Sequence, residues 1–178
     1  MIGFLGLLSS LSDFMLDLFS VRFWFKIVAL ACLGMLGVAF YQQYYHLRMP
    51  CPLCLLQRFC IFVVALFAIL GLWHRSRRLW VNRLYAIAMA GAAFAGALVA
   101  MRHAYLQYVP TEHLSCGADL AFMLDSMPYH RVLLSVLSGS AECSKVDWLL
   151  WGWSIPVWVA LSCIVLTCCS VVGACCKK

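Results

Sequence analysis

Apolar residues fall into four long blocks along the chain, separated by shorter polar or basic stretches. An α-helix needs about 20 apolar residues to cross about 30 Å of hydrocarbon, and each block approaches that length. The pattern therefore predicts four membrane-spanning helices. These spans cover approximately residues 23–42, 55–73, 84–106 and 155–172, and they leave two loops on one side of the membrane, at residues 43–54 and 107–153.

Two further segments have an amphipathic pattern. Within residues 1–20, apolar side chains recur at helical spacing with serines and aspartates between them, which predicts a helix lying in the membrane interface. A signal peptide is the alternative, but no basic region precedes the apolar run. In the second loop, apolar stretches on both sides of Pro128 predict short helices on the membrane surface, followed by a flexible segment at Ser138-Gly139-Ser140.

The composition places the whole chain in the membrane class. Of its 178 residues, 65% are hydrophobic and 11% are charged, and the mean hydropathy is +0.93. Soluble domains lie far from these values. We therefore predict an all-α integral membrane protein, a single domain over residues 1–178 that folds as a four-transmembrane-helix bundle. Nucleic-acid binding is not expected despite the net charge of +6, because the basic residues lie beside the apolar blocks and form no patch with interleaved aromatic residues.

The basic residues predict the orientation of the chain. Three of them, Arg48, Arg131 and Lys145, lie in the two loops named above. Eight flank the opposite ends of the spans: Arg22, Lys26, Arg75, Arg77, Arg78, Arg83, Lys177 and Lys178. By the positive-inside rule, both termini and the connection between the second and third spans are cytoplasmic, so the two loops lie outside.

This orientation divides the eleven cysteines into two groups. Four lie in the outer loops, where the environment is oxidising: Cys51 and Cys54 in the first loop, and Cys116 and Cys143 in the second. The other seven lie within the spans or at their cytoplasmic ends, at positions 32, 60, 163, 168, 169, 175 and 176. We interpret these seven as small buried hydrophobic residues, since their spacing indicates neither a metal site nor acylation. The outer four form two candidate redox pairs.

The C-x-x-C motif of the first loop carries the strongest chemical signal. Cys54 begins an apolar run, so its sulfur is expected at a helix N-terminus, where unpaired N–H groups and the helix dipole favour a thiolate. A zinc site and a structural disulfide are the alternatives, and Cys116 with Cys143 would alone suggest a structural staple. Two pairs on one face favour a dithiol relay. We expect no resident metal ion.

Three polar residues are expected near the same depth as this motif. Arg58 lies four residues after Cys54, on the same helical face, and an arginine within the membrane usually marks a functional site. His103 and Gln107 share one face at the outer end of the third span, and with Arg58 they could hold a polar headgroup. Arg102 is a rival candidate, but its expected role is that of a snorkelling interfacial charge.

Taken together, these residues resemble the disulfide bond formation protein B (DsbB) family of bacterial inner-membrane thiol:quinone oxidoreductases, over nearly the whole length of the chain. The resemblance is carried by Cys51-Pro52-Leu53-Cys54 with Arg58, by His103 and Gln107 ahead of Cys116, and by Glu142-Cys143 followed by Trp148 and Ser154-Ile155-Pro156-Val157-Trp158. One departure is Gln57, where some family members have an acidic residue.

The resemblance implies a specific electron path. A reduced periplasmic DsbA-like thioredoxin-fold oxidase would attack the Cys116–Cys143 disulfide at Cys116, and the released Cys143 would exchange with Cys51. Cys54 would then pass the electrons to ubiquinone or menaquinone, and so to the quinone pool and the respiratory chain. Arg58 would stabilise the developing charge, and His103 and Gln107 would orient the headgroup. The DsbA–DsbB–quinone system is the one known to keep the bacterial periplasm oxidising.

Two alternatives remain open at this point. A reductase of the vitamin K epoxide reductase type is also a four-helix membrane bundle with a C-x-x-C, but there the motif lies late in the chain. A four-span scaffold of the tetraspanin type would have structural disulfides in its larger outer loop. Such a scaffold has no use for a C-x-x-C at a helix start or for Arg58 within the membrane.

Overall fold

The computed structural model describes residues 21–45, 47, 50–74, 78–109, 120–140, 143–144, 146 and 149–175. The amphipathic helix predicted over residues 1–20 and the candidate redox residue Cys116 lie outside the described residues. The elements, in chain order, are α2 (Val21–Tyr45), α3 (Pro52–His74), α4 (Leu79–Tyr108), α5 (Leu120–Ser126), α6 (Tyr129–Ser138), β1 (Leu149–Leu150), β2 (Trp153–Ser154) and α7 (Ile155–Cys175).

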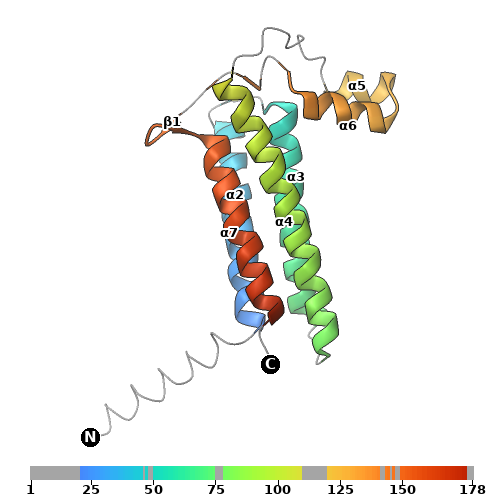
Figure 1. Ribbon diagram of the computed structural model, residues 1–178, viewed down its shortest axis with the longest axis vertical. Coiled ribbons are helices and arrows are strands. Elements are labelled where there is room, and N and C mark those ends of the chain that lie inside the picture. Colours follow the sequence, from blue (N-terminus) through green and yellow to red (C-terminus); the bar gives the residue numbers. More distant parts are fainter. Residues whose placement is uncertain are drawn as a thin grey trace, which may run out of the picture.

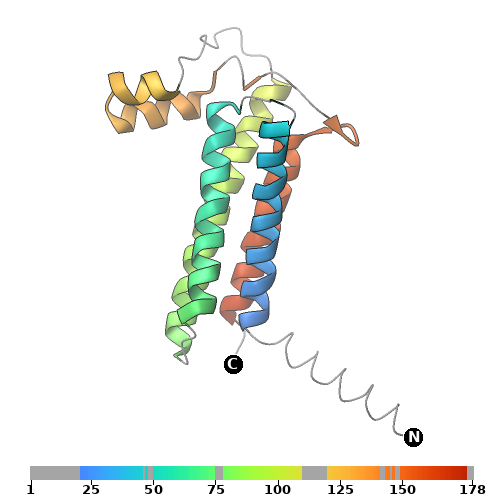
Figure 2. The same cartoon turned by 180° about the vertical axis from the view of Figure 1, so that it is seen from behind.

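Helices α2, α3, α4 and α7 form a four-helix bundle, and each is long and apolar enough to cross a membrane (Figure 1). Helix α2 packs against α3 and α7, and α4 packs against the same two helices. The described chain starts and ends at the same end of the bundle (Figure 2). We call the opposite end, where α3 begins, the cysteine end. The prediction of an all-α four-helix membrane protein is confirmed.

The helices are longer than the apolar blocks that predicted them. Helix α2 continues to Tyr45 and α3 begins at Pro52, so the connection predicted at residues 43–54 shortens to residues 46–51. Proline is favoured in the first turn of a helix because its missing N–H has no partner there in any case. Helix α4 begins at Leu79, since polar residues outside the hydrocarbon can still continue a helix. Hydropathy marks the apolar part of each helix and leaves its ends undefined.

Small residues let the helices approach closely. A Cβ atom added to Gly96 of α4 would lie 3.2 Å from Cβ of Cys60 in α3 and 3.3 Å from Sγ of Cys163 in α7. A Cβ atom added to Gly71 of α3 would lie 2.3 Å from the ring of Phe25 in α2. Close packing of this kind is the main source of helix association in lipid, where burial of apolar surface contributes little.

At the cysteine end, α5 and α6 project sideways from the bundle (Figure 1). Helix α6 is amphipathic: Val132 and Val136 are buried, whereas Tyr129 and Leu134 are exposed. This matches the short surface helices predicted for the second loop. The antiparallel hairpin of β1 and β2 was not predicted; its turn needs positive φ angles at Trp151 and Gly152, and tryptophan rarely adopts one.

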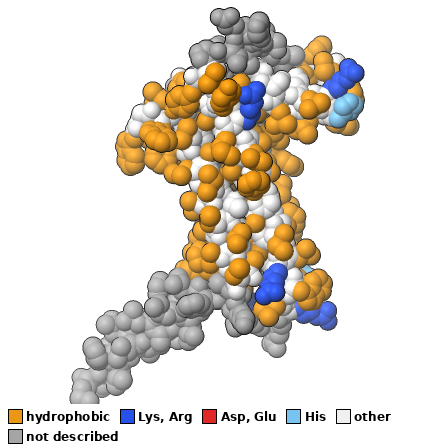
Figure 3. All heavy atoms as spheres, in the orientation of Figure 1, with side chains coloured by type: hydrophobic (Ala, Val, Ile, Leu, Met, Phe, Trp, Pro, Cys, Tyr) orange, Lys and Arg blue, Asp and Glu red, His pale blue; other side chains and the backbone are white. Residues whose placement is uncertain are grey.

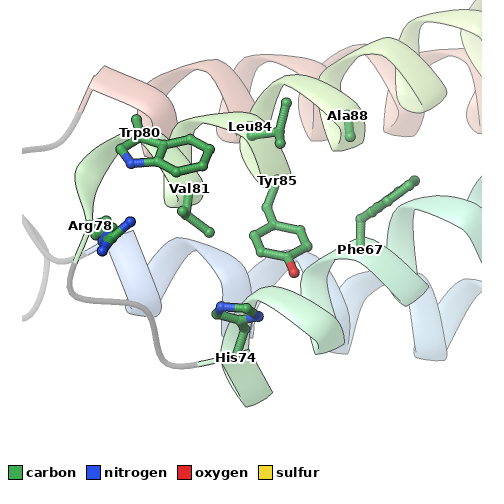
Figure 4. A pocket seen from close by; sticks show the side chains of 8 residues that line it. All are labelled: Phe67, His74, Arg78, Trp80, Val81, Leu84, Tyr85 and Ala88. Atoms are coloured by element: carbon green, nitrogen blue, oxygen red, sulfur yellow. The ribbon is translucent and has the colours of Figure 1, made fainter.

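The surface has an apolar middle and charged ends. In the view of Figure 3, charged side chains lie toward the two ends of the bundle and none lies between them. At the end away from the cysteines, a pocket of about 610 Å³ opens between the end of α3 and the start of α4 (Figure 4). The rings of His74, Trp80 and Tyr85 and the guanidinium of Arg78 are among its lining groups.

Candidate redox site

Cys51 and Cys54 meet at the first turn of α3. Cys51 is the last residue before the helix, and Cys54 lies within its first turn. Their Sγ atoms lie 3.2 Å apart as free thiols, with Cys51 donating to the Cys54 sulfur, and the Cys54 backbone N–H donates to the Cys51 sulfur at 3.4 Å. The helix end leaves such N–H groups unpaired. Its start therefore favours negative charge on this pair of sulfurs.

The imidazole of His103 faces both sulfurs. It comes from α4, is almost fully buried at 3% exposure, and places Nε2 3.8 Å from Sγ of Cys51 and Nδ1 3.9 Å from Sγ of Cys54. The ring nitrogens of a histidine at this position can donate to a thiolate or accept the proton of a thiol. The ring is therefore placed to manage the protons of both cysteines.

Gln57 fixes the orientation of this ring. Its Nε2 lies 3.2 Å from Nδ1 of His103, and the Gln57 side chain is buried one turn into α3. With the amide placed this way, Gln57 donates to Nδ1, so the histidine proton resides on Nε2 and points toward Cys51. Rotating the amide by half a turn would reverse both assignments. Gln57 thus positions the His103 ring, although from the sequence it stood out only as a departure from the family pattern.

Arg58 faces a different neighbour. Its guanidinium donates to Oε1 of Gln43 and, at 3.0 Å, to the backbone carbonyl of Ala39, and it lies 5.7 Å from the ring centroid of Phe40. All three partners belong to α2. Arg58 lies between α2 and α3, while His103 lies between α3 and α4, so the two side chains approach from different pairs of helices. That Arg58, His103 and Gln107 share one layer stays a prediction. Gln107 is half-buried one turn beyond His103.

Cys143, from the second loop, joins the first pair. Its side chain is 1% exposed and packs in one buried cluster with Cys51. The neighbouring Cys51 thiol and burial raise the pKa of Cys143, whereas Ser140 opposes the rise. Ser140 Oγ lies 3.5 Å from Sγ of Cys143, and the Cys143 N–H donates to the Ser140 carbonyl at 2.9 Å. The structure thus brings one cysteine of the second loop to the C-x-x-C motif.

Two residues hold the segment before Cys143 in place. Arg102 of α4 donates to the carbonyl groups of Leu137 at 3.3 Å and Ser138 at 3.1 Å, at the end of α6. Gly139 has a φ of +91°, and a Cβ atom there would lie 2.3 Å from Cδ1 of Leu106. The segment predicted to be flexible is packed in this structure, because glycine permits both the backbone angle and the close approach.

The site is enclosed by apolar side chains. Leu53, Val99, Leu106 and Met123 form one buried cluster with Cys51 and Cys143, and Cys54 packs against it while half-exposed. A site of this kind excludes water and strengthens the electrostatic interactions within it. Of the three cysteines, Cys54 is the one with an open face.

Of the predicted site residues, the structure brings together Cys51, Cys54, Cys143 and His103. The positioning residues Gln43, Gln57 and Ser140 were missed. Gln57 carried a usable signal, since it lies three residues after Cys54 and therefore on the same side of the helix. Ser140 carried none, because only the path of the loop after α6 brings it to Cys143.

Comparisons with known proteins agree with this arrangement. Residues 21–173 match the family described as "Disulfide bond formation protein DsbB". A protein named "Disulfide bond formation protein B" from Marinobacter nauticus is 39% identical over 141 residues, covering 79% of this chain and 83% of the relative. Proteins of the same name from Albidiferax ferrireducens and Aromatoleum aromaticum are 40% identical over 134 residues and 38% identical over 148 residues. These two matches cover 75% and 83% of this chain, and 76% and 88% of the relatives.

The matched region contains α2, α3 and α4, all of α7 but its last two residues, and every cysteine of the candidate redox site. This chain therefore belongs to the disulfide bond formation protein DsbB family.

Proposed function

We propose that this protein is a disulfide-generating thiol:quinone oxidoreductase of the bacterial inner membrane. It reoxidises a periplasmic DsbA-like dithiol oxidase and passes the electrons through two cysteine pairs to ubiquinone or menaquinone. Both termini are cytoplasmic, and the cysteine end faces the periplasm. Family membership, shown above, argues against the scaffold and vitamin K epoxide reductase alternatives.

The observation that carries this proposal is the contact between Cys143 and Cys51. Thiol–disulfide exchange needs an attacking thiolate beside the sulfur that it attacks. Cys143 belongs to the second loop and Cys51 to the first, so their packing in one buried cluster supports exchange between the two pairs. A protein with two independent structural disulfides has no need for this contact.

The exchange steps balance in electrons. A DsbA thiolate attacks Cys116, forms a mixed disulfide with it, and releases Cys143 as a thiolate. Cys143 then attacks Cys51, which forms the Cys51–Cys143 disulfide and releases Cys54. The second DsbA thiol attacks the mixed disulfide and leaves oxidised DsbA with Cys116 reduced. Two electrons have then moved from DsbA into the protein.

Arg58, His103 and Gln107 are the groups that would hold the quinone beside Cys54. A quinone carbonyl accepts hydrogen bonds, and the guanidinium has five N–H donors, of which Gln43 and Ala39 take one each. Arg58 also lies one helical turn from Cys54, so its positive charge stabilises both a thiolate and a developing quinol anion. Before the quinone acts, Cys116 attacks Cys143, which re-forms the Cys116–Cys143 disulfide and releases Cys51 as a thiolate. When bound, the quinone would accept two electrons and two protons as the Cys51 and Cys54 thiols join in a disulfide.

The choice of acceptor has an energetic reason. DsbA is strongly oxidising, with a known reduction potential of about −120 mV, and each 30 mV is worth about 1.4 kcal/mol for a two-electron couple. Oxidising it therefore needs an acceptor with a still higher potential, which ordinary dithiols do not provide. A membrane quinone meets this requirement.

The test is quinone reduction by the purified protein in detergent, followed by absorbance with reduced DsbA as donor. We expect Cys54→Ser and Cys116→Ser to abolish turnover and Cys60→Ser, a cysteine within the bundle, to preserve it. Absence of turnover by the wild type with both ubiquinone and menaquinone would overturn the proposal. So would turnover that survives the loss of Cys54.

A further inference from the structure

The redox site also has the composition of a metal site. Sγ of Cys51, Sγ of Cys54 and a ring nitrogen of His103 all lie within 4.8 Å of one another. The two sulfurs are 3.2 Å apart; Nε2 of His103 lies 3.8 Å from Sγ of Cys51, and the other ring nitrogen, Nδ1, lies 3.9 Å from Sγ of Cys54. In a tetrahedral zinc site, with Zn–S of about 2.3 Å and Zn–N of about 2.0 Å, neighbouring ligand atoms lie about 3.5 to 3.8 Å apart. Small side-chain shifts would satisfy that geometry.

A candidate fourth ligand packs near these three. Cys143 is buried in one apolar cluster with Cys51, and its sulfur lies outside the 4.8 Å that the other three ligand atoms share, so its side chain would turn toward a bound ion. The four residues make a Cys3His set, one of the ligand combinations of closed tetrahedral zinc sites. They come from α3, α4 and the loop after α6, so a bound ion would join three parts of the fold.

We propose that the reduced form of this site binds a thiophilic divalent ion of the Zn²⁺ class through Cys51, Cys54, His103 and Cys143, and that the bound ion blocks disulfide formation. Binding replaces the three thiol protons, which pass to solvent, and transfers no electrons. Oxidation of Cys51 and Cys54 to a disulfide removes two thiolate ligands and expels the ion. Metal binding and oxidation therefore compete for the same sulfurs. The ion is an inhibitor of the reduced state and not a resident cofactor.

Gln57 provides the hydrogen bond that would orient His103 as a metal ligand. Metal-binding histidines usually donate the other ring N–H to an oxygen, which orients the ring. If the Gln57 amide turns by half a rotation, Oε1 accepts a proton from Nδ1 of His103. Nε2 then loses its proton and becomes a ligand on the side of Cys51. The amide thus permits two states of one histidine: a donor toward the thiols and a ligand for the ion.

The test measures metal binding without quinone or DsbA, so its outcome is independent of the proposed function. The purified, dithiol-reduced full chain is freed of reductant and titrated with Co²⁺, then with Zn²⁺. We expect one equivalent of Co²⁺, with the visible bands of a tetrahedral ion and sulfur-to-cobalt charge-transfer absorption. Zn²⁺ should displace it. The chain carrying the Cys51–Cys54 disulfide should bind none at this site.

Variants identify the ligands. Cys54→Ser and His103→Ala should weaken binding at least tenfold, and Gln57→Leu, which removes no ligand, should weaken it about tenfold. A matched control replaces the four cysteines near the end of α7, at positions 168, 169, 175 and 176, with serine and should retain both stoichiometry and spectrum. Should His103→Ala fail to fold, Cys143→Ser tests the same site from the loop. An octahedral spectrum, or affinity unchanged by Cys54→Ser, would overturn the proposal.

Discussion

Cys51 and Cys143 pack in one buried cluster, although they lie in different connections of the bundle. This contact is the leading cause of the raised pKa of Cys143, and burial is the second. The cause exists only while Cys51 is a free thiol. When Cys51 is held in the Cys51–Cys54 disulfide, it has no ionisable proton and no charge that opposes a Cys143 thiolate. Oxidation of the C-x-x-C therefore leaves Cys143, the attacking thiol of the proposed exchange, easier to ionise.

This relationship predicts a pH dependence. An ordinary thiol, with a pKa of 9.0, begins to ionise below pH 9, whereas Cys143 of the reduced protein retains its proton above that pH. Pulse alkylation with iodoacetamide in the presence of a chelator, read by mass spectrometry, should show Cys143 labelling rising only above pH 9. Cys51→Ala should move that rise to lower pH, with labelling at pH 8 about tenfold faster for each unit by which the pKa falls. Identical profiles for both proteins would contradict the assigned cause.

Gly139→Ala should displace Cys143 from Cys51. The substitution strains a backbone held at a φ of +91° and puts a methyl group against Leu106, at a cost of about 1 to 3 kcal/mol. The readout is the yield of the Cys51–Cys143 disulfide in a Cys54→Ser background under mild oxidation, which should fall several-fold. Gly91→Ala is the control, because a Cβ atom there meets nothing within 4 Å. Equal yields in both variants would show that this loop needs no glycine.

Arg58 should act through its charge and its fork of donors. Arg58→Met removes both, and Arg58→Lys retains the charge but cannot reach the Gln43 and Ala39 oxygens together. We expect Arg58→Met to slow quinone reduction about tenfold or more, since a hydrogen bond to a charged group is worth about 1.5 to 3 kcal/mol. The rate of quinone reduction by Arg58→Lys should lie between the rates of the wild type and of Arg58→Met, and its KM for quinone should be raised. Gln43→Leu removes one anchor of the guanidinium but keeps Arg58, so it shows how much of the effect depends on the position of the side chain. Normal turnover by Arg58→Met would show that neither the charge nor the donors of Arg58 are needed.

Gly71→Ala should destabilise the bundle. Its new methyl group would overlap the buried ring of Phe25, so α2 and α3 would have to separate, at a cost of about 1 to 3 kcal/mol. Gly37→Ala, where a Cβ atom meets nothing within 4 Å, should be neutral or slightly stabilising. Unfolding in mixed detergent and SDS, followed by circular dichroism, compares the two. A Gly71→Ala protein as stable as Gly37→Ala would mean that the ring adapts without cost.

The four spans could be predicted because each leaves a direct hydropathy signal, and His103 could be nominated because a polar residue near a span end is conspicuous. The partner of His103 could not be predicted. Arg58 and His103 were expected together on grounds of depth alone, but depth does not say which way a side chain turns around its helix. Arg58 turns to α2 and His103 to the sulfurs. The packing of Gly139 was also hidden, since a Ser-Gly-Ser segment has the composition of a linker.

Helix α4 is long enough to keep the sulfurs that His103 faces close to water. At 30 residues it is about 45 Å long, roughly 15 Å more than the hydrocarbon it crosses. His103 lies near one end of this helix, so the sulfurs that it faces sit close to the level where lipid gives way to water. Each turnover of the proposed reaction exchanges protons as well as electrons. The surplus length of α4 thus holds a dry site within a short distance of an aqueous proton reservoir.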